Sequence, residues 1–311
     1  MKPVLSIIIA CFNDPDLSAT VQSIRDTAGY EVEVVVVDDC SPRPIAAMLG
    51  VKLVRNARRI GCGPSRYIGA MHATGNFLLF TDAHMRFTSN WYENAMGKVL
   101  LPEREKTLHC GSCLTIKAGE QDSDSATGVY YGADFNFCGP DHKFPKLNQV
   151  MECVWAQPKS EDDYEIQAVM GACYFIQRDW FIKLDALRHL KVWAGDEQEL
   201  SIKSWLAGGE IRLLKNVRIG HRFREGKASA MYVMPWHVIR NKLFIIHSCL
   251  PANKAMMLQM KMQRDAQFGL GLKALRDDWS TVETARAYNS ALFVHNFDWL
   301  LARFGLTLPE K

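Results

Sequence analysis

The strongest constraint on the fold lies in the first third of the chain, where strand-like runs alternate with segments of helical spacing. Four such runs cover residues 4–10, 33–37, 52–55 and 76–81. Nearly uninterrupted β-branched sequence, as in the first two runs, is typical of strands buried on both faces of a parallel sheet. Residues 17–27 and 65–73 lie between the runs and have the pattern of helices. The alternation predicts an α/β fold with a right-handed, mostly parallel, Rossmann-like sheet.

The rest of the chain is irregular at first and then helical. Further strands are expected at residues 171–177, 211–214 and 217–221. Further helices are expected at residues 196–207, 231–248, 253–268 and 281–304. We therefore predict a sheet domain over residues 1–227 and a helical C-terminal appendage over residues 228–311.

Composition excludes several classes of protein. Of the 311 residues, 48% are hydrophobic and 23% are charged, which argues against disorder, collagen and coiled coil. The formal net charge of +3 is too small to indicate nucleic-acid binding by itself. No signal peptide is visible, and no apolar run approaches the roughly 20 residues of a membrane-spanning helix. The sequence predicts a soluble protein without a transmembrane segment.

Nine cysteines are scattered along the chain. Cys110 and Cys113 lie close together, but no second pair follows them, so a zinc site has little support. An odd number of scattered thiols is what a reducing compartment allows. We therefore expect reduced cysteines and a cytoplasmic location.

Polar residues follow three of the expected strands at the point where each strand ends. They are Cys11, Asn13, Asp38, Asp39, Asp82 and His84. In parallel α/β sheets, ligands bind beyond the carboxyl ends of the strands. The sequence therefore predicts a ligand site at this edge of the sheet.

Asp82 and His84 are two residues apart, so their side chains point the same way if the backbone stays extended. A carboxylate and an imidazole in this arrangement can hold a divalent ion. The alternative is a helix N-cap aspartate beside an incidental surface histidine, and the pair alone does not choose. His221 ends a distant strand and could be a third ligand at the same edge. Considered alone, it is more typical of a structural histidine.

Asp39 and Arg66 are candidates for nucleotide contacts. Adjacent carboxylates at a strand end rarely serve packing, because burial of unpaired charge is costly. Asp39 could hydrogen-bond a base or ribose, although one of the two aspartates could instead form a turn. Residues 56–66 combine glycines, a helix start and three arginines, which suits phosphate oxygens. Arg58 or Arg59 is expected in a solvated loop, whereas Arg66 is the better candidate for a phosphate contact.

Three acids stand at the start of one expected helix, namely Asp196, Glu197 and Glu199. Acids in a first helical turn interact favourably with the helix dipole, so these three acids could simply stabilise the start of the helix. A carboxylate here could instead hold a substrate hydroxyl or act as a general base.

A basic segment surrounds His221 and could neutralise a diphosphate or guide a polyanion. As a solvated face, the same charges would serve only solubility. The segment comprises Arg212, Lys215, Arg218, Arg222, Arg224 and Lys227.

Taken together, these segments resemble the nucleotide-diphospho-sugar domain of GT-A glycosyltransferases of the family-2 type. The resemblance is closest to the catalytic domain of polypeptide N-acetylgalactosaminyltransferases, which carry an Asp-x-His motif in place of Asp-x-Asp. The matching segments are SIIIACFND, VVVVDDCS, GCGPSRYIGA, FLLFTDAHM, MGACYFIQRDWF, WAGDEQELSIKSW and IGHRFR. They occur in the family's order between about residues 4 and 225. The resemblance implies a GT-A fold, with a donor half over about residues 1–115 and an acceptor half over about 116–227.

The resemblance also implies roles for single residues. Asp82, His84 and His221 would bind a divalent metal, Mn²⁺ in the first place and Mg²⁺ as the alternative. Asp39 would contact uracil or ribose, and Arg66 the diphosphate or sugar. Further donor contacts are expected at Cys11, Asn13, Gly171, Ala172 and Arg222. Catalytic carboxylates facing the donor sugar and the acceptor are expected at Glu197, Asp196 and Glu199.

The chain departs from the family at two of these positions. Gly171-Ala172 replaces Gly-Gly, and Asp196 stands where those enzymes have glutamate. The resemblance therefore does not fix the identity of the sugar or imply a mucin-type protein acceptor. An inverting enzyme needs a carboxylate base on the acceptor hydroxyl, for which Glu197 is the first candidate and Asp196 the second. A retaining enzyme needs none, and the resembled family is retaining.

We therefore expect a metal-dependent glycosyltransferase. It would move a sugar from a nucleotide sugar, by resemblance a UDP-sugar, to a hydroxyl on a glycan, a protein or another polymer. A different acceptor would be a modified base in DNA, such as a hydroxymethyl-pyrimidine, as in some phage enzymes. A chain with these features could also be a non-catalytic nucleotide-sugar binding protein or a nucleotidyltransferase.

Overall fold

The computed structural model describes residues 4–29, 31–116, 128–140, 148–171, 173–223 and 235–308. Its strands are β1 (Leu5–Cys11), β2 (Glu33–Asp38), β3 (Val51–Arg55), β4 (Phe77–Asp82), β5 (Met85–Phe87), β6 (Thr107–Ile116), β7 (Val129–Tyr130), β8 (Ala133–Pro140), β9 (Asn148–Trp155), β10 (Asp163–Glu165), β11 (Cys173–Gln177) and β12 (Glu210–Arg222). Its α-helices are α1 (Leu17–Ala28), α2 (Cys62–His72), α3 (Trp91–Val99), α4 (Arg178–Leu184), α5 (Asp196–Leu206), α6 (Trp236–Cys249), α7 (Ala252–Met262), α8 (Phe268–Arg276), α9 (Trp279–Leu292) and α10 (Phe297–Phe304).

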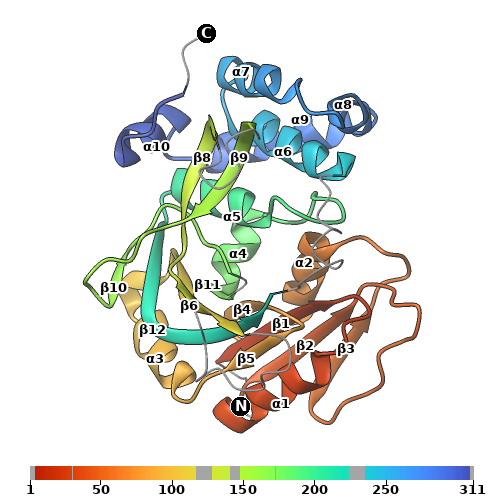
Figure 1. Cartoon of the computed structure of the whole chain (residues 1–311), viewed down its shortest axis with the longest axis vertical. Helices are drawn as coiled ribbons and strands as arrows, with labels where there is room; N and C mark the ends of the chain where they lie inside the picture. The colour runs from red at the N-terminus through yellow and green to blue at the C-terminus, as the bar shows by residue number, and fades with distance from the viewer. Residues whose placement is uncertain are drawn as a thin grey trace.

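A ten-stranded sheet forms the centre of the described structure, with the order β10-β12-β6-β11-β4-β1-β2-β3 and with β5 on β12 and β7 on β6 (Figure 1). β1 to β4 pair in parallel, as the buried runs predict, and so do β6 and β12. β11 runs antiparallel between β4 and β6. The predicted α/β fold with a Rossmann-like sheet is confirmed.

The central strands are buried on both faces. Ile7 and Ile9 pack with α1 and α3 on one face, whereas Ile8 packs with α2 on the other, and none of the three is exposed. Alternate side chains of a strand point to opposite faces, so burial of both faces requires an uninterrupted apolar run. This is the physical reason for the sequence pattern of residues 4–10.

The parallel strands also end at one level. In the register of the sheet, Cys11 at the end of β1 lies opposite Asp38 of β2, and Ala10 lies opposite Asp82 of β4. The polar residues that follow the strands therefore gather at one edge, as the sequence predicts.

The structure corrects the prediction in the later strands. The two strands expected at residues 211–214 and 217–221 are one strand, β12, whose register against β6 shifts between Leu214 and Arg218. The residues at this irregularity interrupt the strand-like sequence pattern, although the pairing with β6 resumes after them. β6 and the β8–β9 hairpin were not predicted.

The helical boundaries differ as well. α2 begins at Cys62, ahead of the expected residue 65, and α7 ends at Met262. The helix expected at residues 281–304 is divided into α9 and α10, because the side chain of Asn296 accepts a hydrogen bond from the Trp299 backbone and caps a new helix.

The predicted C-terminal helices form a layer at one end of the molecule, over α5 and the β8–β9 hairpin (Figure 1). Within this layer, α6 packs against α7, α8 and α9, and it also packs against α5 beneath the layer. Four successive α6 residues, Leu243 to Ile246, are fully buried. A helix that is buried on all sides belongs to a core, so α6 is an interior element and not a surface attachment.

Candidate active site

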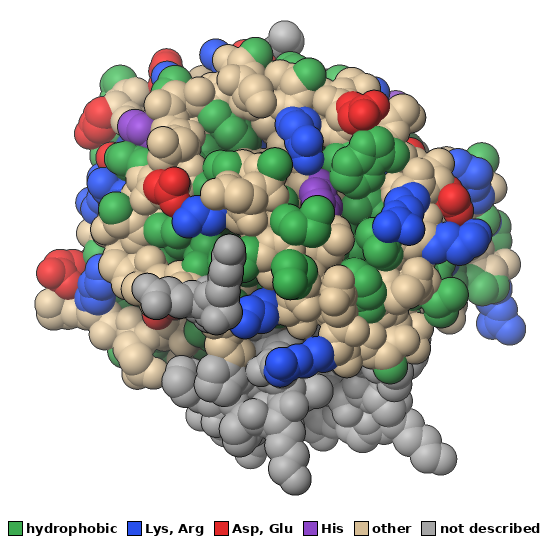
Figure 2. All heavy atoms as spheres, turned by 90° about the horizontal axis from the view of Figure 1, so that it is seen from above, with side chains coloured by type: hydrophobic (Ala, Val, Ile, Leu, Met, Phe, Trp, Pro, Cys, Tyr) green, Lys and Arg blue, Asp and Glu red, His purple; other side chains and the backbone are tan. Residues whose placement is uncertain are grey.

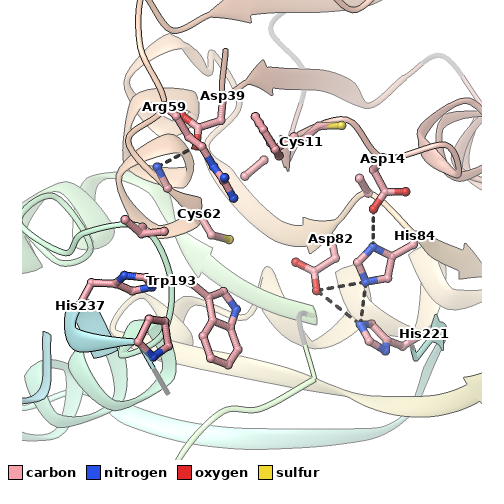
Figure 3. A pocket seen from close by; sticks show the side chains of 16 residues that line it. Cys11, Asp14, Asp39, Arg59, Cys62, Asp82, His84, Trp193, His221 and His237 are labelled. Carbon is pink, nitrogen blue, oxygen red and sulfur yellow. Dashed lines mark hydrogen bonds and ion pairs between the residues drawn. The ribbon is translucent and has the colours of Figure 1, made fainter. Parts of the chain in front are cut away.

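A cleft of about 360 Å³ lies at the carboxyl ends of β1, β2 and β4 (Figure 3). Its walls come from the strand ends, the loops before α2 and α5, and the start of α6. The side chains labelled in Figure 3 are Cys11, Asp14, Asp39, Arg59, Cys62, Asp82, His84, Trp193, His221 and His237. The predicted edge of the sheet therefore carries a cleft with acidic, basic and imidazole groups.

Asp82, His84 and His221 point toward one another at one end of this cleft (Figure 3). The Nε2 atoms of the two imidazoles are 3.2 Å apart. Oδ2 of Asp82 is 3.4 Å from Nε2 of His221 and 3.9 Å from Nε2 of His84. Asp82 is the last residue of β4 and the next element is the strand β5, so this aspartate is not the N-cap of a helix. The fold thus brings together the three residues that the sequence singled out as ligands.

A fourth residue, Asp14, stands behind His84. Its Oδ2 atom is 2.9 Å from Nδ1 of His84. A carboxylate at Nδ1 favours the tautomer whose Nε2 is free to accept a metal, and it fixes the orientation of the ring. Sequence analysis did not select Asp14, whose only signal was its position in the turn after β1.

The donor set fits a divalent transition metal. Imidazole nitrogen and carboxylate oxygen both bind such ions, whereas Mg²⁺ prefers oxygen ligands alone. Burial raises the pKa of Asp82, but hydrogen bonding with His221 and the charges of Arg66 and His84 outweigh burial and hold the pKa far below its usual range. Asp82 is therefore ionised near neutral pH, as a metal ligand must be.

Arg66 connects the three ligand residues with a second cavity. Its guanidinium is almost fully buried, and it donates to Oδ1 of Asp82 at 2.8 Å and to Oδ2 of Asp196 at 3.1 Å. The second cavity has a volume of about 240 Å³ and shares Cys62, Asp82 and Trp193 with the cleft. Positive charge is thus fixed where the two spaces meet.

Two of the three predicted acids of α5 line the second cavity. Asp196 is buried against Arg66, and burial raises its pKa to about 6 although the arginine opposes the shift. Glu197 is less buried, and its Oε1 atom accepts a hydrogen bond of 2.7 Å from the Tyr174 hydroxyl. Glu197 has no cation within ion-pair distance among the described side chains, which leaves its charge available to a ligand.

The third acid, Glu199, is turned into the interior and lines neither space. Its carboxylate is fully buried, 3.0 Å from Nζ of Lys203, and accepts a hydrogen bond of 2.8 Å from the Leu187 backbone. The structure therefore does not bring Glu199 to the other candidates.

Asp39 lines the cleft and also shapes its wall. Oδ1 accepts a hydrogen bond of 2.8 Å from the Ile60 backbone, and Oδ2 accepts one of 2.7 Å from the Gly61 backbone. Asp38 forms the expected turn, since its Oδ1 accepts a hydrogen bond of 2.8 Å from the Ser41 backbone. Of the two adjacent carboxylates, Asp39 thus holds the cleft wall and Asp38 holds the turn.

The remaining predicted donor contacts have mixed positions. Cys11 lines the cleft, whereas Asn13 does not, and its backbone N–H donates to the Ser41 hydroxyl. Gly171 has φ of +96° and lies against Cys113, outside the residues that line either cavity. Ala172 lies outside the described residues.

The basic segment does not act as a unit in the described structure. Nε of Arg212 donates to Asp163 at 2.6 Å, and Nζ of Lys215 donates to a backbone carbonyl at 2.9 Å. Arg222 is paired with Asp16 at 2.5 Å and does not line the cleft. Arg224 and Lys227 lie outside the described residues.

Three cleft residues were missed or assigned elsewhere by sequence analysis. Arg59 lines the cleft, and its guanidinium lies 3.9 Å above the centre of the Phe12 ring. Trp193 lines both cavities, and His237 enters the cleft from α6 (Figure 3). No local pattern marks His237, because its role depends on where α6 packs.

Comparison with known proteins agrees with this description. The model of the family described as glycosyl transferase family 2 matches residues 6–185. Human polypeptide N-acetylgalactosaminyltransferase 10 is 27% identical over 237 residues, covering 72% of this chain and 38% of that protein. N-acetylgalactosaminyltransferase 7 of Drosophila melanogaster is 29% identical over 245 residues, covering 71% and 40%. The chain spans about two fifths of the length of these curated relatives.

Solved structures share the fold. A crystal structure of GalNAc-T7 with UDP, GalNAc and Mn²⁺ superposes with a TM-score of 0.74 at 18% identity, over 97% of this chain and 57% of that one. A crystal structure of S. aureus TarS 1-349 in complex with UDP-GlcNAc gives a TM-score of 0.54 at 15% identity, over 99% and 93%. The expected GT-A fold is confirmed. In the described part of the chain, no helix combines the length and apolar character needed to cross a bilayer.

Proposed function

The chain belongs to glycosyl transferase family 2, and from this premise we propose that it transfers a sugar from a UDP-sugar to an acceptor hydroxyl with the help of Mn²⁺. The acceptor is a hydroxyl on a glycan, a protein or another polymer. The observation that carries the proposal is the convergence of Asp82, His84 and His221 at one end of a cleft at the sheet edge. The relatives named as N-acetylgalactosaminyltransferases, and the GalNAc-T7 structure with UDP and Mn²⁺, support the donor class.

Asp82, His84 and His221 would hold the metal, with Asp14 orienting His84. A bound divalent ion supplies Lewis-acid stabilisation of the charge that develops on a departing diphosphate. Arg66 adds a fixed positive charge beside Asp82 at no reorganisation cost during the reaction. Together these residues would stabilise the negative charge of the departing diphosphate.

We assign the cleft to the nucleoside diphosphate and the second cavity to the transferred sugar. The cleft has aromatic and cationic walls from Phe12 and Arg59, with Cys11 and Asp39 close by, which suits a base and ribose. The second cavity has carboxylates and the guanidinium of Arg66, which suit sugar hydroxyls. Further donor contacts are proposed at Asn13, Gly171, Ala172 and Arg222.

Glu197 is the proposed base if the reaction inverts the anomeric carbon. It lines the second cavity, and a neutral phenol is its hydrogen-bond partner. Asp196, the second candidate, is engaged by Arg66, and Glu199 is engaged by Lys203. A retaining reaction would need no base, so the stereochemistry of the product decides this role.

We also propose how the chain is organised. Residues 1–227 form the catalytic domain, and residues 228–311 form the helical region. Figure 2 looks onto the end formed by the C-terminal helices and shows basic side chains interspersed with acidic and hydrophobic ones, which gives a DNA acceptor no added support there. Nine free cysteines support a cytoplasmic location.

The test is a panel of nucleotide sugars with and without Mn²⁺. A true donor should raise the melting temperature by mass action, and it should be hydrolysed slowly to a nucleoside diphosphate and a free sugar. Release of pyrophosphate would identify a nucleotidyltransferase. Binding without sugar release over hours would identify a non-catalytic sensor, and no binding of any nucleotide sugar would remove the proposal.

A further inference from the structure

The loop at residues 191–195 contains the most constrained backbone near the site. It carries Trp193, which is 43% exposed and lines both cavities. Val192 and Ala194 have φ of +55° and +73°. Residues with a Cβ rarely adopt this left-handed region, and they stay there only when their surroundings hold them. Something must therefore fix this loop.

Asn241 of α6 holds the loop from one side. Its side chain is fully buried, and Oδ1 accepts a hydrogen bond of 2.9 Å from the Lys191 backbone. Nδ2 donates to the carbonyl oxygens of Lys191, Trp193 and Ala194 at 2.8, 3.1 and 2.9 Å. One amide thus contacts four backbone groups on both sides of Trp193, with its two N–H donors shared among the three carbonyl oxygens.

The loop before α2 holds the same segment from the other side. The Val192 carbonyl accepts a hydrogen bond of 2.8 Å from the Cys62 backbone, and the Val192 N–H donates to Ile60 at 3.0 Å. A Cβ on Gly61 would lie 2.1 Å from the Val192 carbonyl oxygen, so the approach requires glycine. Asp39 in turn fixes Ile60 and Gly61. The Trp193 loop is therefore clamped between the sheet edge and α6.

α6 contacts the site at two further points. His237, one turn before Asn241, lines the cleft. Lys242, the next residue, is paired with Glu152, which lines the second cavity. One helix from the C-terminal region thus lines the cleft, bonds to the loop and pairs with a residue that lines the second cavity.

We propose that Asn241 is a positioning residue for nucleotide binding, and that it acts by holding Trp193 at the junction of the two cavities. The inference rests on the proposed function, because it concerns nucleotide binding in that cleft. It makes α6 a working part of the site, so the helical region is more than a scaffold.

The experiment measures UDP binding with Mn²⁺ by isothermal titration for the full chain and five variants. Asn241→Ala should weaken binding about tenfold, the value expected from loss of a few net hydrogen bonds. Asn241→Asp should be at least as weak, because its carboxylate would face three carbonyl oxygens. Asn289→Ala is the matched control, since Asn289 is also buried and donates to an α6 carbonyl, but its bonds are to Ser248 and Cys249 and not to the Trp193 loop.

A double-mutant cycle with Trp193→Phe tests the route of the effect. If Asn241 acts through Trp193, the double variant should bind UDP within about twofold of Trp193→Phe alone. Additive losses, or an Asn289→Ala loss equal to that of Asn241→Ala, would overturn the inference.

Hydrogen exchange of the wild type covers the case in which Asn241→Ala does not fold. The Lys191 and Val192 amides should be protected without ligand, and exchange as fast as in an open loop would contradict the clamp. Failure of the wild type to bind UDP with Mn²⁺ would count against the proposed function, whereas the exchange result judges the clamp separately.

Discussion

Asp82 and Asp196 share one arginine, yet their surroundings shift their pKa values in opposite directions. Arg66 donates to both carboxylates. Asp82 also has two imidazoles beside it, and its pKa is held far below its usual range. Asp196 is buried more deeply among acids, and its pKa rises to about 6 because burial outweighs the attraction of Arg66.

The difference shows that the role of a carboxylate follows from what surrounds it. Asp82 has cationic and imidazole partners and opens on the cleft, so it stays charged and can bind a metal. Asp196 is a buried group whose charge is tolerated only because of Arg66. Four predictions test this contrast, two on activity and then two on stability, and each pair gives the larger expected effect first.

The metal side should be the more sensitive to substitution. His84→Ala or Asp82→Ala should lower Mn²⁺-dependent transfer more than about 1000-fold, since loss of the metal's stabilisation is worth several kcal/mol. The measurement is UDP release with Mn²⁺ titrated from zero. His72→Ala is the control, because His72 is exposed on α2 and does not line the cleft. Full activity of either site variant in chelator would refute the metal site.

The second cavity should respond through Glu197. Under an inverting mechanism, Glu197→Gln should slow transfer by about 100-fold or more with donor affinity nearly unchanged, as loss of a general base does. Steady-state kinetics with separate donor titrations measure this split. Asp196→Asn is the comparison variant. If it proves the more severe of the two, the base is assigned wrongly, and retention of configuration would remove the need for a base.

Removal of the shared arginine should destabilise the fold. Arg66→Met leaves Asp82 and Asp196 without their common cation, and loss of one partner of a buried pair costs about 3–5 kcal/mol. Urea denaturation measures the change in the free energy of unfolding. Lys273→Met, which breaks the exposed pair with Asp277, should change it by less than about 1 kcal/mol. Equal effects of the two variants would contradict the burial argument.

The smallest effect concerns pH. Because the pKa of Asp196 is raised from 3.8 to about 6 on folding, the folded state binds its proton more tightly than the unfolded state. Its contribution to stability is therefore present below about pH 4 and is lost as pH rises to about 6. Asp196→Asn should gain about 2 kcal/mol relative to wild type between pH 4.5 and 7, measured by urea denaturation without metal. Parallel pH profiles would show that Asp196 does not titrate in this way.

Much of the sheet and of the ligand group could be predicted from local sequence. A strand buried on both faces must be apolar throughout, so the apolar runs at residues 4–10 and 33–37 were enough to predict two central strands. Parallel strands end at a common edge, which explains why Asp82 and His84 were expected in a site. Its place at a strand end made His221 a possible third ligand, but only the resemblance tied it to this pair, because nothing local links the three residues.

Other features had no local signal. Asp14, Trp193 and Asn241 act through contacts between segments that are distant in sequence. Glu199 has the same local pattern as its neighbours at the start of α5, yet it pairs with Lys203 and the Leu187 backbone in the interior and lines neither cavity. A sequence pattern gives the residue type and the local spacing, but not the partner.

By itself, the sequence determined that this chain forms a parallel-stranded α/β core with an acidic, histidine-bearing edge, because alternation and strand burial leave few other solutions. Tertiary structure alone decided that Asp82 would stay charged between imidazoles while Asp196 would be buried with a raised pKa, although both contact Arg66. It also decided that a C-terminal helix would complete the site. Both outcomes depend on burial and on partners far away in the chain, which set the charge and the position of a side chain.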